Sequence, residues 1–193
     1  MRKLLWALPM LALLTLSGCG YNDFQTKDEQ VKAAWGEVLN QYQRRADLIP
    51  NLVATVQGYA AQERDVLIGV TNARAKATSV NVSAEAISDP AAMQKFQQAQ
   101  AELSGALGRL LVVAENYPQL KSDQNFIRLQ DELANTENKI AQERRKYNQT
   151  VQKYNTDIEL FPKNIAASMF GFQRNDAYFK AEGAAKTPPK VKF

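Results

Sequence analysis

Apolar residues recur at alternating spacings of four and three positions through the first long segment of the chain. A spacing near 3.5 residues is typical of helices that pack along a common seam, so residues 28–77 are predicted to form one long helix. Pro50 lies inside this segment and removes a backbone hydrogen bond. Because the apolar rhythm keeps its phase across Pro50, we favour a kink there over a break. The seam consists of Val31, Trp35, Val38, Tyr42, Ile49, Leu52, Val56, Tyr59, Val66, Val70, Ala73 and Ala77.

Two further helical stripes follow a predicted loop at residues 78–88. Asp89-Pro90 combines an N-cap residue with a proline at the first helical position, which predicts the start of a second helix. This helix ends before Tyr117-Pro118, because the residue before a proline disfavours the helical conformation. Ser122 can cap a third helix that ends at Phe161-Pro162, and a short fourth helix follows.

The predicted fold is therefore all-α, with one domain at residues 28–182. We expect an elongated antiparallel helical bundle of three long helices and a short C-terminal helix, with the first long helix kinked near Pro50. The last residues, 183–193, are basic and rich in proline. A segment of this composition cannot bury a core, so it is predicted to be a disordered tail.

The N-terminal stretch has the pattern of an export signal. Arg2 and Lys3 precede an apolar run from Leu4 to Leu16, which is shorter than the roughly 20 residues that a membrane-spanning helix needs. The run ends in Leu16-Ser17-Gly18-Cys19, which resembles the lipobox of bacterial lipoproteins. In such proteins the cysteine is acylated and becomes the new N-terminus.

We therefore predict that residues 1–18 are a signal peptide that is removed and that Cys19 carries the lipid, with palmitate among its acyl chains. Residues 19–27 would then be a lipidated tether to the membrane, held stably because two or three acyl chains are needed for firm attachment. The alternative is an uncleaved short membrane anchor with an incidental cysteine. Gly20 stands where some lipoproteins carry an aspartate that retains them in the inner membrane, so we favour the outer membrane.

Composition narrows the chemistry that remains. The 193 residues include 24 Lys and Arg against 20 Asp and Glu, one cysteine and no histidine. This charge balance does not indicate nucleic-acid binding. Without histidine, Ser-His-Asp and Cys-His catalysis are excluded, and so are the Glu-x-x-His metal pairs of helical bundles. We expect no catalytic residues, no cofactor and no metal site.

The most unusual polar cluster precedes Pro50 and includes Arg44, Arg45 and Asp47. Arg45 occupies an apolar seam position, and so does Glu63 further along the same predicted helix. These four residues could form a partner or ligand site, but we favour an interhelical salt bridge that fixes the register of the bundle. Glu143, at a seam position of the third helix, could be a partner for Arg45 or for the neighbouring Arg144 and Arg145. Two other acidic residues, Glu132 and Glu137, are expected on solvated faces or in interhelical hydrogen bonds.

Aromatic and cationic residues alternate near the C-terminus. Phe170, Phe172, Tyr178 and Phe179 could form a membrane-interface or self-association element, because aromatic rings favour the depth of lipid headgroups. We favour a second interpretation, in which these rings fold back and close one end of the bundle.

Several long phrases are together similar to the LemA family of bacterial envelope proteins. They are VKAAWGEVLNQYQRRADLIPNLVATVQGYAAQE, LQDELANTENKIAQERRKYN and YNTDIELFP, and the resemblance extends from Tyr21 to Phe179. It implies a helical antiparallel bundle held at a membrane by its N-terminus. Many members use a transmembrane helix for this purpose, whereas this chain has the lipoprotein-type signal. The family often has histidine before the glutamate that corresponds to Glu63, and here that residue is Gln62.

These observations lead to a noncatalytic, lipid-anchored bundle of the cell envelope as the first functional hypothesis. It would act by self-assembly, as a homo-oligomer, or by binding an unidentified envelope protein. The alternative is an envelope-located binder of small molecules or metals, or an enzyme, that uses Glu, Arg and Tyr residues of the bundle. A third possibility is an accessory subunit whose specificity lies in its partner.

Overall fold

The computed structural model describes residues 4–83 and 86–180, with side chains from residue 20 onward. This part of the chain contains helices and no strands, which confirms the prediction of an all-α bundle. The helices are α1 (Leu4–Tyr59), α2 (Arg64–Ser79), α3 (Pro90–Ala114), α4 (Pro118–Lys121), α5 (Gln124–Glu159) and α6 (Lys163–Phe170).

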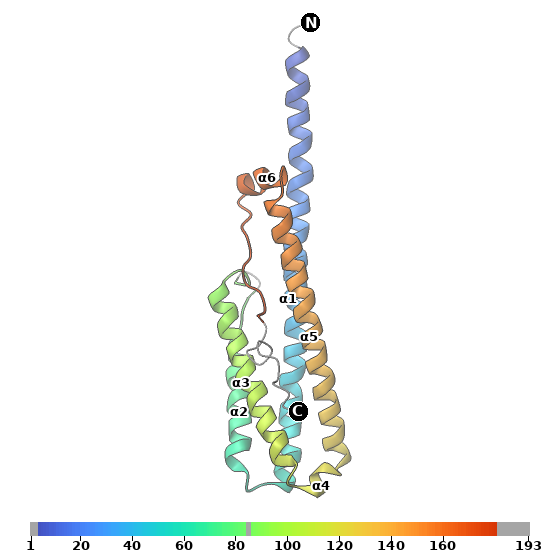
Figure 1. Ribbon diagram of the computed structural model, residues 1–193, viewed down its shortest axis with the longest axis vertical. Helices are drawn as coiled ribbons and strands as arrows, with labels where there is room; N and C mark the ends of the chain where they lie inside the picture. Colours follow the sequence, from blue (N-terminus) through green and yellow to red (C-terminus); the bar gives the residue numbers. More distant parts are fainter. Residues whose placement is uncertain (1–3, 84–85, 181–193) are drawn as a thin grey trace, which may run out of the picture.

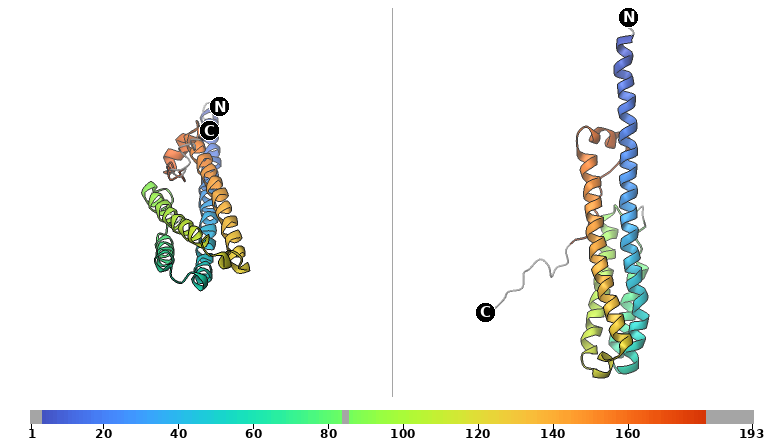
Figure 2. Two further views of the ribbon diagram at one scale, coloured as in Figure 1. Left: turned by 60° about the horizontal axis from the view of Figure 1, so that its bottom comes forward. Right: turned by 90° about the vertical axis from the view of Figure 1, so that its right-hand side faces the viewer.

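The long helices run alternately down and up a narrow bundle (Figure 1). α1 packs lengthwise against α5, and α2 packs against α3. The short helix α4 lies in the turn between α3 and α5, at the end of the bundle that also holds the α1–α2 turn; we call this the distal end. At the opposite end, α6 follows α5, and the N-terminal part of α1 continues beyond the bundle (Figures 1 and 2). This second end is called the N-terminal end below.

The first predicted helix is divided, but at a different place from the one considered. α1 is continuous through Pro50 and ends at Tyr59, and α2 starts at Arg64 in the opposite direction. A break at Pro50 is therefore wrong, and so is a single helix over residues 28–77. The reason is that α1 and α2 bury their apolar faces against each other and against the rest of the bundle, which a single helix of that length could not do.

Pro50 is accommodated because another helix compensates for the hydrogen bond that it lacks. A proline at this position cannot donate to the carbonyl of Ala46, one turn earlier. That carbonyl accepts a hydrogen bond of 2.7 Å from Nε of Arg74 in α2. Arg74 therefore both satisfies a buried carbonyl of α1 and joins the two helices.

The apolar core consists of two clusters stacked along the bundle. The Trp35 cluster lies toward the N-terminal end and includes Val38, Tyr42, Phe96, Ile140, Tyr147, Val151 and Phe179. The Leu52 cluster lies toward the distal end and includes Ile49, Val56, Val70, Leu103, Leu110, Phe126 and Leu133. Three buried polar side chains separate the two clusters. Along α1, α3 and α5 respectively, Arg45, Gln100 and Thr136 fall between residues of one cluster and residues of the other.

The packing also begins earlier than residue 28. The predicted tether, residues 19–27, continues α1 in this structure, and Phe24 within it is completely buried. Its ring lies 5.2 Å from the ring of Phe172, centroid to centroid. The predicted tail, residues 183–193, lies outside the described residues. Cleavage before Cys19 stays a prediction.

Candidate functional site

Among the described side chains, Arg45 is the only arginine or lysine that is buried, with 2% of its surface exposed. Its Nη1 donates to Oγ of Ser104 at 3.0 Å and to Oε1 of Glu137 at 2.8 Å. Its Nη2 donates to the side-chain and main-chain oxygens of Gln100, and its guanidinium lies 5.0 Å from the ring centroid of Tyr42. Arg45 therefore links α1 to α3 and α5, which is the interhelical contact that we favoured.

Glu143 is not the partner of Arg45, so the first of the two roles considered for it is wrong. The ion pair is with Glu137, whereas Glu143 lies further along α5, with Oε2 3.5 Å from Nζ of Lys146. The seam of α5 has Leu133 and Ile140 in the two apolar clusters, so the polar layer between them falls at Glu137.

A cavity of about 50 Å³ lies beside Arg45, lined by Tyr42, Gln97, Gln100, Ser104, Glu137, Ile140 and Arg144. This is room for water molecules but not for an organic substrate, because one water already occupies roughly 30 Å³ of liquid. The donors of Arg45 are directed at side chains of the bundle itself. The arrangement can fix the register of three helices.

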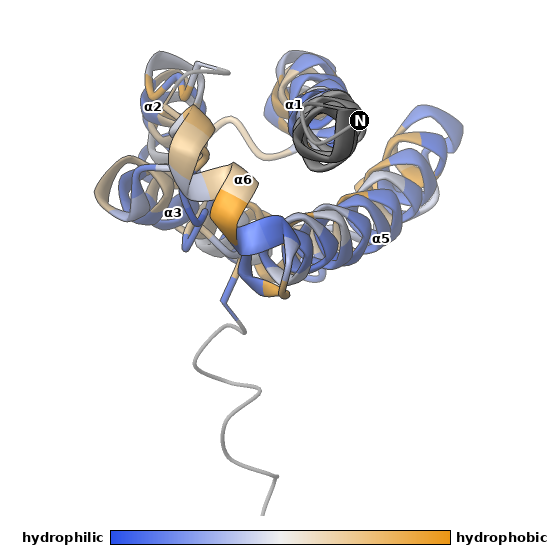
Figure 3. Ribbon diagram, turned by 90° about the horizontal axis from the view of Figure 1, so that it is seen from above, coloured by the Kyte–Doolittle hydropathy of each residue, from blue (hydrophilic) through white to orange (hydrophobic). Residues whose placement is uncertain are grey.

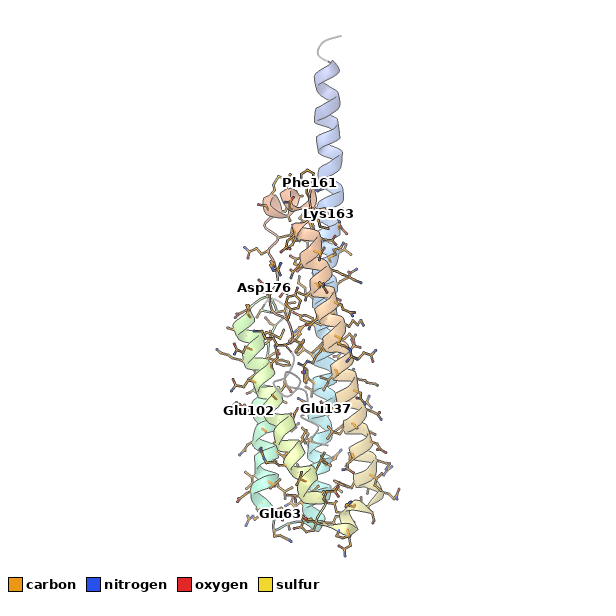
Figure 4. The ribbon with its side chains drawn as sticks, in the orientation of Figure 1. Glu63, Glu102, Glu137, Phe161, Lys163 and Asp176 are labelled. Carbon is orange, nitrogen blue, oxygen red and sulfur yellow. The ribbon has the colours of Figure 1, made fainter. Side chains whose placement is uncertain are left out.

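The other members of the predicted cluster do not join Arg45. Arg44 and Asp47 are exposed on α1, and Asp47 accepts a hydrogen bond of 2.8 Å from Gln43. Glu63 lies at the distal end (Figure 4), where it accepts a hydrogen bond of 2.8 Å from the hydroxyl of Tyr117. The structure therefore separates the four residues into a buried register contact, an exposed face and a turn.

The buried tyrosines are not candidates for acid–base chemistry near neutral pH. Burial raises the pKa of Tyr147 to about 12, and burial likewise raises the pKa of Tyr154. The hydroxyl of Tyr147 donates to the main-chain oxygens of Ala177 at 3.3 Å and of Ile87 at 3.4 Å. At the distal end, the hydrogen bond to Glu63 raises the pKa of Tyr117. All three hydroxyls remain protonated at neutral pH and act as hydrogen-bond donors.

The aromatic residues near the C-terminus separate into two groups. Phe179 is buried, with its ring stacked 5.8 Å from that of Trp35. Tyr178 is half-buried, and its hydroxyl accepts a hydrogen bond of 2.7 Å from the side-chain amide of Asn155. Phe172 is also half-buried, whereas Phe170 is 42% exposed. The fold-back interpretation describes Phe179, and an interfacial role stays a prediction for Phe170.

The segment that carries Phe179, residues 171–180, is not helical and runs back along the bundle (Figure 1). We call it the C-terminal strap. Three amide side chains hold it by pairing with its backbone, each through one N–H and one C=O. The pairs are Asn155 with Asn175, at 2.7 and 2.9 Å; Asn148 with Phe179, at 2.9 and 2.9 Å; and Gln97 with Tyr178 and Lys180, at 3.2 and 3.1 Å.

At the N-terminal end, α1 lies directly against α6. A Cβ atom at Gly20 would lie 3.6 Å from Cβ of Ala166, and the ring of Tyr21 lies 5.1 Å from that of Phe170. Cys19 immediately precedes these contacts; its side chain lies outside the described residues. Lipidation of Cys19 therefore stays a prediction, but the residue next to it is in contact with α6.

Four charged side chains join α1, α5 and α6 at this end. Nζ of Lys163 lies 2.7 Å from Asp23 and 3.4 Å from Asp157. Nζ of Lys27 lies 3.1 Å from Asp23 and also contacts Asp157. Hydrogen bonds from Lys163 and Lys27 hold the pKa of Asp23 below its ordinary value, and the bond from Lys27 does the same for Asp157. The two lysines and two carboxylates form a neutral network, which we call the charge quartet.

Sequence reasoning did not identify the charge quartet, Gln100 or the amides that hold the strap. Gln100 had a usable signal, because it lies on the apolar stripe of α3 between Phe96 and Leu103, as Arg45 does on α1. Asn148 and Asn155 are seven residues apart, which places them on one face of α5 beside Tyr147 and Tyr154. The charge quartet had no such signal, because its residues lie on three separate elements.

Two features of the described residues concern metal binding and membrane spans. Among these residues no group of three or more Cys, Asp and Glu side chains lies close enough together to hold a metal ion. In the same part of the chain, none of the helices has an apolar stretch long enough to cross a membrane.

Comparison with known proteins agrees with the architecture. A family model described as the LemA family matches residues 34–193. Magnetosome proteins MamQ 1 and MamQ 2 of Paramagnetospirillum magneticum are each 26% identical to the chain over 184 residues, which cover 87% of this chain and 67% of the relative. Magnetosome protein MamQ of Magnetospirillum gryphiswaldense is 26% identical over 197 residues, which cover 94% of this chain and 72% of the relative.

Proposed function

We propose that this chain, which belongs to the LemA family, is a noncatalytic, lipid-anchored scaffold of the bacterial cell envelope. It acts by presenting the surface of its bundle to another copy or to an envelope partner protein. The observation that carries the noncatalytic part is the Arg45 site. Its guanidinium is directed at Ser104, Gln100 and Glu137, and the adjoining cavity of about 50 Å³ accommodates water but no substrate.

The anchor is supported by the order of the N-terminal residues and by their place in the fold. Two cations, an apolar run and Leu16-Ser17-Gly18-Cys19 follow one another as they do in a lipoprotein signal. Gly20 lies against α6 at one end of the bundle, so a lipid on Cys19 would attach at that end.

The anchor is tested by producing the full chain in bacteria supplied with an alkyne-labelled palmitate. We expect label on the wild-type chain, together with the loss of residues 1–18 by mass spectrometry. Cys19→Ser should abolish both label and processing, and Ser17→Ala serves as a matched control that keeps both. An unlabelled, unprocessed wild-type chain that stays in the membrane fraction would support the uncleaved anchor instead.

The choice of membrane is tested by density fractionation of the same cells. We expect the wild-type chain in the outer membrane and the variant Gly20→Asp in the inner membrane. Gly20→Ala is the matched control, because it adds a Cβ near Ala166 without the charge. A wild-type chain found in the inner membrane would contradict the outer-membrane assignment and leave the lipid anchor intact.

The scaffold role is tested by crosslinking in intact membranes, followed by purification of the chain and identification of what is attached. We expect crosslinks to a second copy or to a reproducible envelope protein. The alternative, a small-molecule binder, draws on a surface groove of about 410 Å³ whose lining includes Lys32, Tyr154 and Arg174. A metabolite that copurifies and raises the melting temperature, with a loss of this effect in Lys32→Met, would favour that alternative over the scaffold.

A further inference from the structure

Exposed apolar side chains gather at the N-terminal end of the bundle. Of the nine large apolar residues that are exposed in the described part of the chain, six belong to this end. We call them the end patch: Tyr21 (40% exposed), Leu160 (55%), Phe161 (80%), Ile165 (61%), Met169 (65%) and Phe170 (42%). Single exposed apolar residues are ordinary, but six at one end of a bundle are a candidate contact surface.

The fold holds this patch rigidly. α6 lies across the end of the bundle, and a hydrophobic stretch of it faces the viewer in the view from above (Figure 3). Ala167 is buried beneath it, and Ile165 and Met169 are four residues apart, so they share one face of α6. Lys163, at the start of α6, is bound to Asp23 and Asp157. Three of the six patch residues, Ile165, Met169 and Phe170, therefore lie on a helix that is tied to both α1 and α5.

The course of α1 indicates what covers the patch. α1 continues N-terminally past α6 and leaves the bundle at this end (Figures 1 and 4). Gly20 touches α6, and Cys19 and Leu16 precede it by one and four residues, which is about 1.5 and 6 Å along the helix axis. Whether the proposed anchor is a lipid on Cys19 or the apolar run that ends at Leu16, it would place the membrane within about one helical turn of α6.

We propose that the end patch inserts into the headgroup and upper acyl region of the bilayer, so that α6 forms a second, noncovalent membrane contact beside the N-terminal anchor. This inference rests on the proposed function in one respect, namely that the N-terminal segment is held at a membrane. Tyr21 supplies a ring of the kind enriched at membrane interfaces. Phe161 and Phe170 supply apolar rings of the kind that interfacial helices bury, and Ile165 and Met169 supply aliphatic surface.

The charge quartet indicates whether insertion of the end patch depends on the charge of the lipid headgroups. The two lysines of the quartet are neutralised by Asp23 and Asp157, so the end patch has no surplus of positive charge from this network. We therefore expect insertion into zwitterionic phosphatidylcholine, with little effect of anionic lipid or of salt, because the driving force is burial of apolar surface.

The experiment places a tryptophan in the patch and measures its depth. The full chain is purified from bacterial membranes as the cell processes it and reconstituted into phosphatidylcholine vesicles with or without brominated acyl chains, which quench nearby indoles. Phe161→Trp and Ile165→Trp are compared with Val112→Trp, a matched control because Val112 is 69% exposed near the distal end of α3. The native Trp35 is 1% exposed in the core and adds a constant background. Trp6 lies in the apolar run, so every variant also carries Trp6→Phe, which removes an indole that the lipid would quench if the run were not cleaved.

We expect brominated lipid to lower the emission of the added indole at 161 or 165 by about twofold and to leave that at 112 unchanged, as for a side chain about 5–10 Å deep. The same loss at low and high salt is expected. Unquenched emission at both positions, in protein that still floats with the vesicles, would overturn the insertion while leaving the anchor intact.

Two other outcomes also contradict the proposal and are distinguishable. Protein that does not float with vesicles in any variant shows that the proposed anchoring itself has failed. Unquenched emission at both positions together with a dimer that dissociates in Phe161→Ser shows that the patch is covered by a second copy. Far-UV circular dichroism confirms that each variant is folded, and the two patch positions serve as independent probes if one of them does not fold.

Discussion

The contact between Arg74 and the carbonyl of Ala46 explains why a proline is tolerated inside α1, and this explanation can be measured. Replacing Arg74 by methionine removes the donor and leaves the carbonyl of Ala46, a residue only 3% exposed, without a partner. A hydrogen bond from a charged donor contributes about 1.5–3 kcal/mol. Because Arg74 is itself only half-buried, we expect a loss of about 2 kcal/mol from the free energy of unfolding.

The proline provides the internal control. In Pro50→Ala the amide at position 50 can donate to the carbonyl of Ala46, so Arg74 becomes dispensable. Pro50→Ala alone should stabilise the protein by about 1–2 kcal/mol, since interior proline costs roughly 3 kcal/mol in a helix and part of this is offset in the unfolded chain. In that background, Arg74→Met should cost about 0.5 kcal/mol or less.

The assay is urea unfolding of the purified protein in mild detergent, monitored by far-UV circular dichroism. In a separate thermal melt, Arg74→Met should lower the melting temperature by about 4–8 °C in the wild-type background. Arg64→Met, on the exposed start of α2, is the matched control and should change the free energy of unfolding by less than about 0.5 kcal/mol. An equal cost of Arg74→Met with and without Pro50 would refute the role that we assign to Arg74.

Three further predictions follow from other contacts. The raised pKa of Tyr147, about 12 against 10.0, means that its stabilising effect is complete below pH 10 and lost as the pH rises toward 12; Tyr147→Phe should therefore flatten the loss of unfolding free energy in that range, by up to about 2–3 kcal/mol. The lowered pKa of Asp157, caused first by its hydrogen bond from Lys27, gives stability that is present above pH 4 and lost below it. Asp157→Asn should reduce that acid loss and cost less than about 1 kcal/mol at pH 7 in urea titrations. Gly171 caps α6 with a φ of +77°, so Gly171→Ala should cost about 1–2 kcal/mol and speed hydrogen exchange in α6.

The helical character of the chain was predictable because it depends on local spacing, whereas the α1–α2 turn was not. Tyr59 and Val66 are seven residues apart, so the seam rhythm reads through the turn without a change of phase. The turn itself, residues 60–63, has the sequence Ala-Ala-Gln-Glu, in which every residue favours a helix. The turn forms because α2 buries Leu67 and Val70 by packing back, and that gain is tertiary.

The less favoured alternative, a break at Pro50, was wrong in the opposite direction: there the local sequence indicates a helix end that the structure does not have. A proline with no nearby compensation would be a reasonable helix end, but its compensation comes from Arg74 on another helix. The same limit applies to Arg45. Its seam position indicated a buried charge that needs a partner, and this was sufficient to expect an interhelical contact. The choice between Glu137 and Glu143 depends on the lengthwise register of α5 against α1, and the sequence pattern of neither helix determines that register.

The arrangement of the two ends constrains how a scaffold of this shape could work. If α6 rests on the bilayer, the uninterrupted α1 carries the α1–α2 turn about 60 Å away from it, since the 40 residues from Gly20 to Tyr59 rise about 1.5 Å each. Both ends are tied, by the charge quartet at α6 and by the hydrogen bond of 2.9 Å between Tyr59 and Asp123 at the turn. Arg45, between the two core clusters, fixes the register of α1 against α3 and α5. If the proposed scaffold binds a partner in the same membrane, a short partner would reach the flank near the Trp35 cluster, whereas one that binds the turn would have to extend far from the bilayer.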